Sequence, residues 1–351
     1  MARLHNLGTA ALLLIALLVG GCASTTFDAP PRVQRIEEQD ETLSWWRLPD
    51  RSGRFETRQV ASSQPSDLPD PDALVVAPTD LYDRLRRGFS LPELNTARVR
   101  QRQAWYAQRP EMMQRILERA NRHLFHILEE LERRNMPTEL ALVPFIESGF
   151  DAQAVSSAQA VGLWQFIPGT ATRYKLRIDD VRDERRDVLA STSAALDYLS
   201  DLYALFGDWQ LALASYNWGE NAVARAVSRN RAAGRPITYS NLTLPEETSD
   251  YVPKLQAVKN LLLNPDVLGV SLPPMPNRPY LGSVLAPAEL TVRDAVRLSG
   301  LPAGQFIALN AAFSGLNILK GDRIVLPVDT VSEFEARMHE HLTRRPVRRR
   351  R

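Results

Sequence analysis

One glutamate, Glu147, ends an apolar run and has the setting that an acid catalyst needs. Leu140, Val143 and Glu147 fall at i, i+3 and i+7, so on a helix they share one stripe, and the other side chains of that turn are mostly apolar. Burial in such a helix disfavours the charged carboxylate and raises its pKa. A carboxylic acid that stays protonated near neutral pH can protonate a leaving group. Taken alone, the pattern also fits a helix-end glutamate that turns back to water.

Three further motifs follow Glu147 in order. The set is E-S at 147–148, G-L-W-Q at 162–165, A-S-Y-N-W-G at 214–219 and E-T-S-D-Y-V-P at 247–253. Each motif is weak alone, but four in this order over about a hundred residues resemble the soluble-lytic-transglycosylase catalytic domain of the lysozyme superfamily. The runs R-R-D-V-L-A-S-T at 185–192 and Y-V-P-K at 251–254 add to the resemblance, which extends from about Asp80 to about Val328.

The resemblance implies a mainly α-helical, lysozyme-like domain that cleaves peptidoglycan glycan strands without water and without a cofactor. Protonated Glu147 would donate to the oxygen between N-acetylmuramic acid and N-acetylglucosamine. The same residue would then take the proton of the muramoyl 6-hydroxyl, which attacks C1 and leaves a 1,6-anhydro end. Ordinary glycosidases use two carboxylates, whereas here one side chain would serve both steps.

The resemblance also implies a set of substrate-binding residues: Ser156, Gln165, Tyr216, Asn217, Glu247 and Tyr251. Ser156 would hold the N-acetyl group, although the adjoining Ser157 makes an ordinary turn serine an open alternative. Gln165 would bond the sugar, with Gly162 allowing close backbone approach to the ligand. Tyr216 and Asn217 would line the cleft, with the tyrosine hydroxyl near Glu147.

Two positions near the C-terminal motifs complicate this assignment. Glu247 could be read as a second catalytic carboxylate, whereas the resemblance makes it a structural or binding residue. Trp218 occupies a position that is usually small in the family, so the shape of the neighbouring subsite is expected to differ.

Two other functions remain open from the sequence. One is a lysozyme-like hydrolase in which Asp151 or another acid activates water; hydrolysis adds a water to the product mass. The other is a non-catalytic murein-binding lipoprotein, against which the intact Glu147, Gln165, Tyr216 and Asn217 set argues.

The N-terminus has the features of a lipoprotein export signal. Arg3 and His5 precede an apolar run at 10–19 that is too short for a membrane span, and L-V-G-G-C at 18–22 resembles a lipobox. We therefore predict a signal peptide over residues 1–21 and lipidation of Cys22. Ala23, rather than aspartate, follows the cysteine, which by resemblance favours anchoring in the outer membrane, on its periplasmic face. Residues 22–79 are proline-punctuated and polar, which predicts a flexible tether.

The catalytic domain is predicted over residues 80–270, with a motif core at about 137–263. Apolar side chains recur at helical spacing over 111–135, and Pro137 suits the first turn of the helix that ends at Glu147. Asp187 is a plausible N-cap for a helix over 188–206. Further helices are expected over 209–217, 220–231 and 246–263.

Residues 277–328 resemble a degenerate LysM module, a small βααβ fold that binds N-acetylglucosamine polymers. Two short helices are expected within 290–309 and a strand within 321–327, but no opening strand is evident near Gly282. Murein binding by this segment and simple packing on the catalytic domain both remain open. A C-terminal helix and an arginine-rich tail, 329–351, complete the chain.

Composition limits the other functional classes. The chain is 44% hydrophobic and 24% charged with a formal net charge of +2, as expected for a globular protein. Cys22 is the only cysteine, so a disulfide within the chain is impossible. His123 and His126 lack a further ligand nearby, and phosphate loops, dinucleotide fingerprints and zinc spacings are absent from the sequence. We therefore predict no metal site, no nucleic-acid partner and a monomer.

Overall fold

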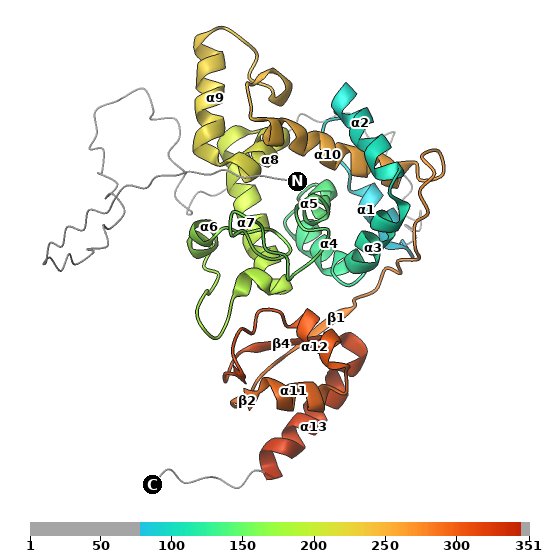
Figure 1. The fold of residues 1–351 in the computed structure, drawn as a ribbon, viewed down its shortest axis with the longest axis vertical. Helices are drawn as coiled ribbons and strands as arrows, with labels where there is room; N and C mark the ends of the chain where they lie inside the picture. The colour runs from blue at the N-terminus through green and yellow to red at the C-terminus, as the bar shows by residue number, and fades with distance from the viewer. Residues whose placement is uncertain (1–77, 345–351) are drawn as a thin grey trace, which may run out of the picture. The chain divides into compact units, whose positions relative to one another are not determined.

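The computed structural model describes residues 78–344, all of which lie in one compact unit. The fold is mainly α-helical with a small C-terminal α+β segment, which confirms the predicted fold class (Figure 1). None of the helices in the described range is both long and apolar enough to cross a bilayer. The predictions for the signal peptide, Cys22 and most of the tether concern residues outside this range.

Four helices precede the residues around Glu147: α1 (Leu81–Arg87), α2 (Ala97–Ala107), α3 (Pro110–Ala120) and α4 (Leu124–Arg133). The apolar helical spacing over 111–135 is divided between two helices, α3 and α4. The chain breaks between α3 and α4, where the amides of Arg122 and His123 bond to carbonyls only three residues back. The apolar stripe continues across this break because both helices bury the same side against the core, so periodicity alone did not reveal the turn.

A 3₁₀ turn and a single turn of α-helix bring Glu147 to the site. Pro137 precedes η2 (Thr138–Leu142), and α5 (Val143–Glu147) follows it and ends at Glu147. Glu139 in η2 is fully buried, accepts the backbone amides of the 90–91 segment and pairs with Lys259 at 3.0 Å. These contacts hold η2, the turn that leads into α5. The position of Glu147 at the end of α5 therefore depends on the helix that carries Lys259.

The second half of the catalytic region consists of α6 (Pro168–Arg173), η3 (Glu184–Arg186), α7 (Val188–Phe206), α8 (Trp209–Trp218), α9 (Glu220–Ala232), η4 (Tyr239–Asn241) and α10 (Glu246–Leu263). The expected helices α7 to α10 are confirmed to within a residue at each end. Asp187 caps α7 as predicted, because its carboxylate accepts the amides of Leu189 and Ala190. Helix α10 packs against α2, α5 and α8, and it also carries Lys259 (Figure 1).

The C-terminal segment consists of β1 (Leu281–Leu285), β2 (Leu290–Thr291), α11 (Val292–Ser299), α12 (Ala303–Leu309), β3 (Asn317–Ile318), β4 (Arg323–Pro327), η5 (Val328–Thr330) and α13 (Val331–Arg344). Strand β1 pairs antiparallel with β4, from Leu281 opposite Pro327 to Leu285 opposite Arg323. An opening strand therefore exists, although it was not evident in the sequence, because only Val284 of its five residues is buried. This segment has an apolar core of its own, which includes Phe306 and Phe334.

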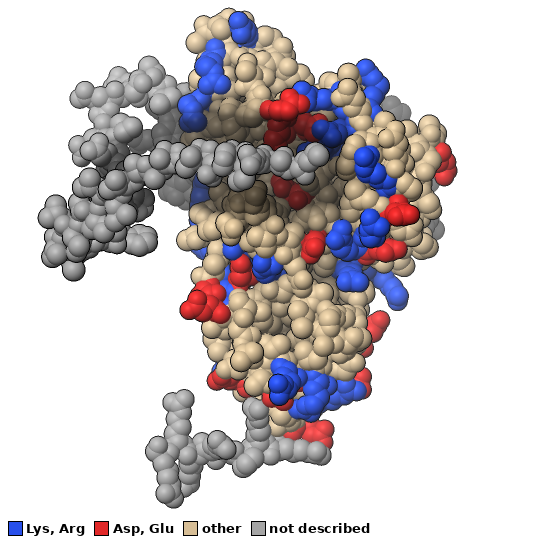
Figure 2. All heavy atoms as spheres, viewed as in Figure 1, with Lys and Arg blue, Asp and Glu red and all other residues tan. Residues whose placement is uncertain are grey.

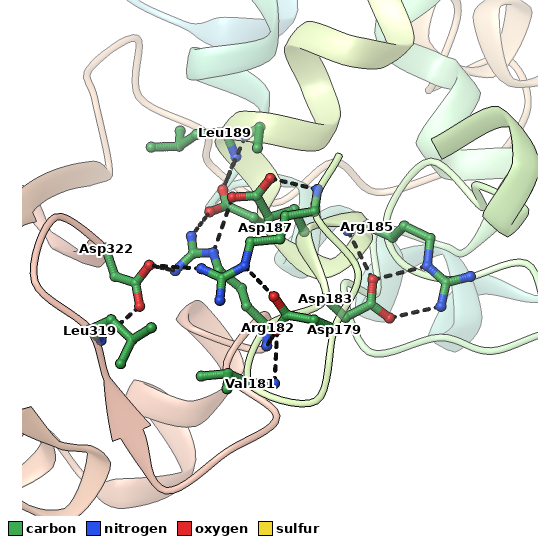
Figure 3. A network of polar contacts seen from close by, with 12 residues as sticks. Asp179, Val181, Arg182, Asp183, Arg185, Asp187, Leu189, Leu319 and Asp322 are labelled. Atoms are coloured by element: carbon green, nitrogen blue, oxygen red, sulfur yellow. Dashed lines mark hydrogen bonds and ion pairs between the residues drawn. The ribbon is translucent and has the colours of Figure 1, made fainter. Parts of the chain in front are cut away.

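The C-terminal segment packs on the loop that precedes α7. The amide of Asp183 donates to the carbonyl of Ala312 at 2.8 Å, and the Arg182 guanidinium lies 4.8 Å from the centre of the Phe313 ring. Asp322 faces both Arg182 and Arg177 (Figure 3). Packing on the catalytic region is thus present, whereas murein binding by the segment stays a prediction.

Candidate active site

Glu147 is held by a direct hydrogen bond from Tyr251. The Tyr251 hydroxyl, on α10, donates to Glu147 Oε1 at 2.6 Å. Burial raises the pKa of Glu147 to about 7; the Tyr251 hydrogen bond lowers it, the charge of Glu247 raises it and the charge of Lys254 lowers it. A carboxyl group with a pKa near 7 can exist in both forms at neutral pH, so it can give a proton and take one back.

The G-L-W-Q loop lies beside Glu147 and is tied to it through the next residue. The Ser148 hydroxyl donates to the carbonyl of Leu163 at 2.8 Å. Trp164 is fully buried, and its ring nitrogen donates to Thr192 of α7 at 3.0 Å. The middle of the loop is therefore tied on one side to the residue that follows Glu147 and on the other side to α7.

Gly162 is required by protein packing rather than by the approach of a ligand. Its φ is +86°, and a Cβ built there would lie 1.9 Å from the Arg185 carbonyl oxygen. The ligand-approach explanation drawn from the sequence is replaced by this contact. Only glycine combines that backbone conformation with that close approach.

Arg185 and its neighbours support the loop from behind. The Arg185 guanidinium donates to the carbonyls of Gln159 and Phe166 and pairs with Asp183 at 2.8 Å. Buried Arg182 pairs with Asp187, the N-cap of α7 (Figure 3). Arg185 and Asp187 of the R-R-D-V-L-A-S-T run thus hold the loop and the start of α7, and Arg182 and Asp183, just before the run, contact the C-terminal segment.

Tyr216 and Asn217, at the end of α8, lie close to this centre. The Tyr216 hydroxyl donates to the Trp164 carbonyl at 2.7 Å, and Asn217 accepts a hydrogen bond from Thr248 at 2.7 Å. Burial and then the charge of Glu147 raise the pKa of Tyr216 well above its usual value. The Tyr216 hydroxyl was expected near Glu147, and the charge of Glu147 does act on it, but the hydroxyl that donates a hydrogen bond to Glu147 is that of Tyr251.

Two of the remaining predicted binding residues, Ser156 and Gln165, are engaged with the protein itself, whereas Glu247 is exposed. Ser156 accepts the amide of Ala160 at 3.0 Å, so it closes a turn in the loop, as the turn alternative required. Gln165, at a φ of +50°, folds its amide onto the Gly162 carbonyl at 2.8 Å. Glu247 is exposed at the start of α10. Their roles toward a sugar remain predictions.

Asp151 is positioned as a structural residue. Its carboxylate accepts the amide of Gln153 at 2.8 Å and lies 3.7 Å from Arg119. Both are structural contacts of Asp151, and the mass of the reaction products is what separates the hydrolase alternative from the single-carboxylate mechanism.

Sequence reasoning missed two contributors to the site. Thr248 donates to Asn217, and Lys254, one turn after Tyr251, lowers the pKa of Glu147. Both residues lie inside motifs that the sequence analysis recognised. For Lys254, the sequence offered only its i, i+3 spacing from Tyr251 as a sign that it contributes to the site.

Comparison with known proteins gives a match to one family model and to several relatives. Residues 126–237 match the Transglycosylase SLT domain. The chain is 32% identical over 310 residues to "Membrane-bound lytic murein transglycosylase D" of Escherichia coli strain K12 and, equally, to that of strain CFT073. The aligned region covers 87% of this chain and 64% of those relatives, so the chain spans less than two thirds of their length.

A further relative is the "Putative tributyltin chloride resistance protein" of Alteromonas sp. (strain M-1). It is 44% identical over 122 residues, which are 34% of this chain and 59% of the relative. The family match covers Glu147, the G-L-W-Q loop and the α8 motif, whereas α10 with Tyr251 lies outside it. Residues 126–237 of this chain are therefore similar to the transglycosylase SLT domain, and the matched stretch includes Glu147.

Proposed function

We propose that this protein is a lytic transglycosylase that cleaves the β-1,4 bond between N-acetylmuramic acid and N-acetylglucosamine in peptidoglycan and leaves 1,6-anhydromuramoyl ends. The observation that carries the proposal is one carboxyl group with a pKa of about 7, held by Tyr251. The SLT domain match and the name of the E. coli relatives support the same reaction.

The reaction follows from what Glu147 can do in each form. Tyr251 occupies Oε1, so the acidic proton of neutral Glu147 belongs on Oε2 and is given to the glycosidic oxygen. The N-acetyl carbonyl of the muramoyl sugar stabilises the cationic C1. Glu147, now charged and stabilised by the Tyr251 hydrogen bond, takes the proton of the 6-hydroxyl as that oxygen attacks C1. Atoms balance without water.

Mass spectrometry of digested sacculi tests the proposal. Anhydromuramoyl products are 18 mass units lighter than hydrolysis products, because one water is missing. Reducing muramic ends in the wild-type digest would replace the proposal with the muramidase reaction.

Tyr251→Phe is expected to shift the pH profile upward. The Tyr251 hydrogen bond stabilises charged Glu147. Removal of this hydrogen bond therefore raises the pKa of Glu147, by about one unit if the bond contributes about 1.5 kcal/mol. Free enzyme is active while Glu147 is protonated; the alkaline limb of kcat/KM near pH 7 should therefore move toward higher pH.

Tyr239→Phe is the matched control for this variant. Tyr239 is also a buried tyrosine, but its hydroxyl donates to the Thr248 carbonyl at 2.8 Å rather than to a carboxylate. It should leave the alkaline limb in place. An unchanged limb in both variants would contradict the assigned role of Tyr251.

The protein is further proposed to be anchored in the outer membrane through lipidated Cys22. Cys22→Ser is expected to release the protein from the membrane fraction, because several acyl chains on one thiol are what make such anchoring stable. The measurement is immunoblotting of membranes after a carbonate wash, with Ser24→Ala as the neighbouring control. Equal membrane recovery of Cys22→Ser and wild type would refute the anchor.

A further inference from the structure

A basic groove lies next to the candidate active site and is not used by the reaction above. It has a volume of about 540 Å³ and is bounded by α2, α3, the end of α5 and one side chain of α10. Ile146 and Ser148, the neighbours of Glu147, both line it. The groove therefore adjoins the turn that carries Glu147, although Glu147 itself is not one of its lining residues.

The charged residues of the groove are all cationic. Its described lining contains Arg102, Arg115, Arg119 and Lys254 and no carboxylate. Arg102 and Lys254 share one acid, Asp250, at 2.6 and 3.4 Å, so this trio keeps a net positive charge. Figure 2 shows Lys and Arg gathered over the α2 and α3 side of the molecule.

The two arginines of α3 keep donor capacity for a ligand. Arg115 is largely exposed and meets Glu111 only at 3.9 Å. Arg119 meets Asp151 at 3.7 Å, and its buried Nε has no hydrogen-bond partner within the described residues. A guanidinium offers five donors in a plane that matches a carboxylate, so these two side chains can accept acidic groups.

The rest of the lining is apolar and aromatic. Trp105 is 38% exposed, with the Arg109 guanidinium 4.1 Å from its ring centre, and Tyr106, Met112, Ile116 and Phe145 also contribute. Such a surface accepts small methyl groups between charged ones. A neutral glycan strand has no counterpart for four cations, whereas a short peptide with carboxylates and alanyl methyl groups matches both features.

We propose that this groove binds the acidic peptide stem carried by the muramoyl sugar at the scissile bond. The inference rests on the proposed function, since the stem is attached to the sugar that Glu147 acts on. Because the groove adjoins the turn that carries Glu147, the bound stem and the bond that is broken belong to the same muramoyl residue of the substrate. The groove thereby makes cleavage depend on a stem-bearing muramoyl residue.

The test compares two substrates: glycan strands with their peptide stems, and the same strands after an amidase has removed the stems. Arg115→Gln combined with Arg119→Gln is expected to lower kcat/KM about tenfold on stem-bearing strands, or about 1.4 kcal/mol, and to leave bare strands unaffected. Added salt should weaken the wild type on stem-bearing strands only, because salt screens exposed charges.

Arg133→Gln is the control. Like Arg115, Arg133 is an exposed arginine that pairs with one acid of its own helix, but it lies on α4, outside the groove. It should behave as wild type on both substrates. An equal loss of kcat/KM by the double variant on both substrates, or no loss on either, would overturn the proposal.

Calorimetric titration of the wild type and the double variant with the free tetrapeptide stem measures binding without catalysis. It therefore tests the groove even if no anhydro product forms and the proposed function fails; weaker binding by the variant supports the groove, and equal binding refutes it.

Discussion

Glu147→Gln is expected to lower the rate of murein cleavage by roughly 10⁴-fold or more while the protein stays folded. General acid catalysis is typically worth 10²–10⁴-fold, and here the same side chain also acts as the base. The amide keeps the size of the carboxyl group and an oxygen that can accept the Tyr251 hydrogen bond, but it supplies no proton. Release of anhydromuramoyl products from purified sacculi measures the effect.

Asp151→Asn is the matched control for this variant. Asp151 pairs with Arg119 and closes a turn, so its neutralisation should retain the anhydro product and most of the rate. Loss of activity in Asp151→Asn would require a second catalytic carboxylate and would favour hydrolysis instead.

The same Glu147→Gln variant is expected to be more stable than wild type at pH 8. The pKa of Glu147 is raised from 4.5 to about 7 on folding, so the folded state binds the proton more tightly, and stability falls as pH rises from about 4.5 to 7. Glutamine has no such charge. We expect a gain of about 3 kcal/mol in the free energy of unfolding at pH 8, absent at pH 4, because each unit of the raised pKa corresponds to about 1.4 kcal/mol. Urea unfolding at both pH values measures it; a loss at pH 8 would contradict burial as the cause.

Gly162→Ala is expected to destabilise the protein by at least about 3 kcal/mol and to abolish cleavage. A left-handed backbone costs an ordinary residue about 1–2 kcal/mol, and a Cβ 1.9 Å from the Arg185 carbonyl oxygen forces the backbone apart in addition. The displaced loop carries Trp164 and Gln165, so catalysis should fail with the packing.

Gly169→Ala is the control for the glycine variant. Gly169 lies in α6 with an ordinary backbone conformation and nothing within 4 Å of an added Cβ. Its substitution should be neutral or slightly stabilising, because alanine is the better helix former. Thermal unfolding of both variants, followed by circular dichroism, checks the pair, and equal melting temperatures would contradict the packing role of Gly162.

The helices were predictable where one local signal determined them. The carboxylate of Asp187 and the apolar period after it marked α7, and α10 was found to the residue. The break between α3 and α4 was missed because the apolar stripe runs through it. Strand β1 was missed because a short, half-exposed strand with a glycine has no clear alternation and is specified by its partner β4.

The sequence by itself determined the helical class and the candidate acid Glu147, because helix period, capping and motif order are local properties. Only the tertiary structure decided that Tyr251, 104 positions away, contacts Glu147, and that Gly162 is needed for the Arg185 carbonyl. The basic groove likewise combines α2, α3 and Lys254 of α10. The physical reason is that the pKa of a buried group, a close backbone contact and the lining of a pocket all depend on residues that are distant in the sequence. Only the folded chain brings those residues next to one another.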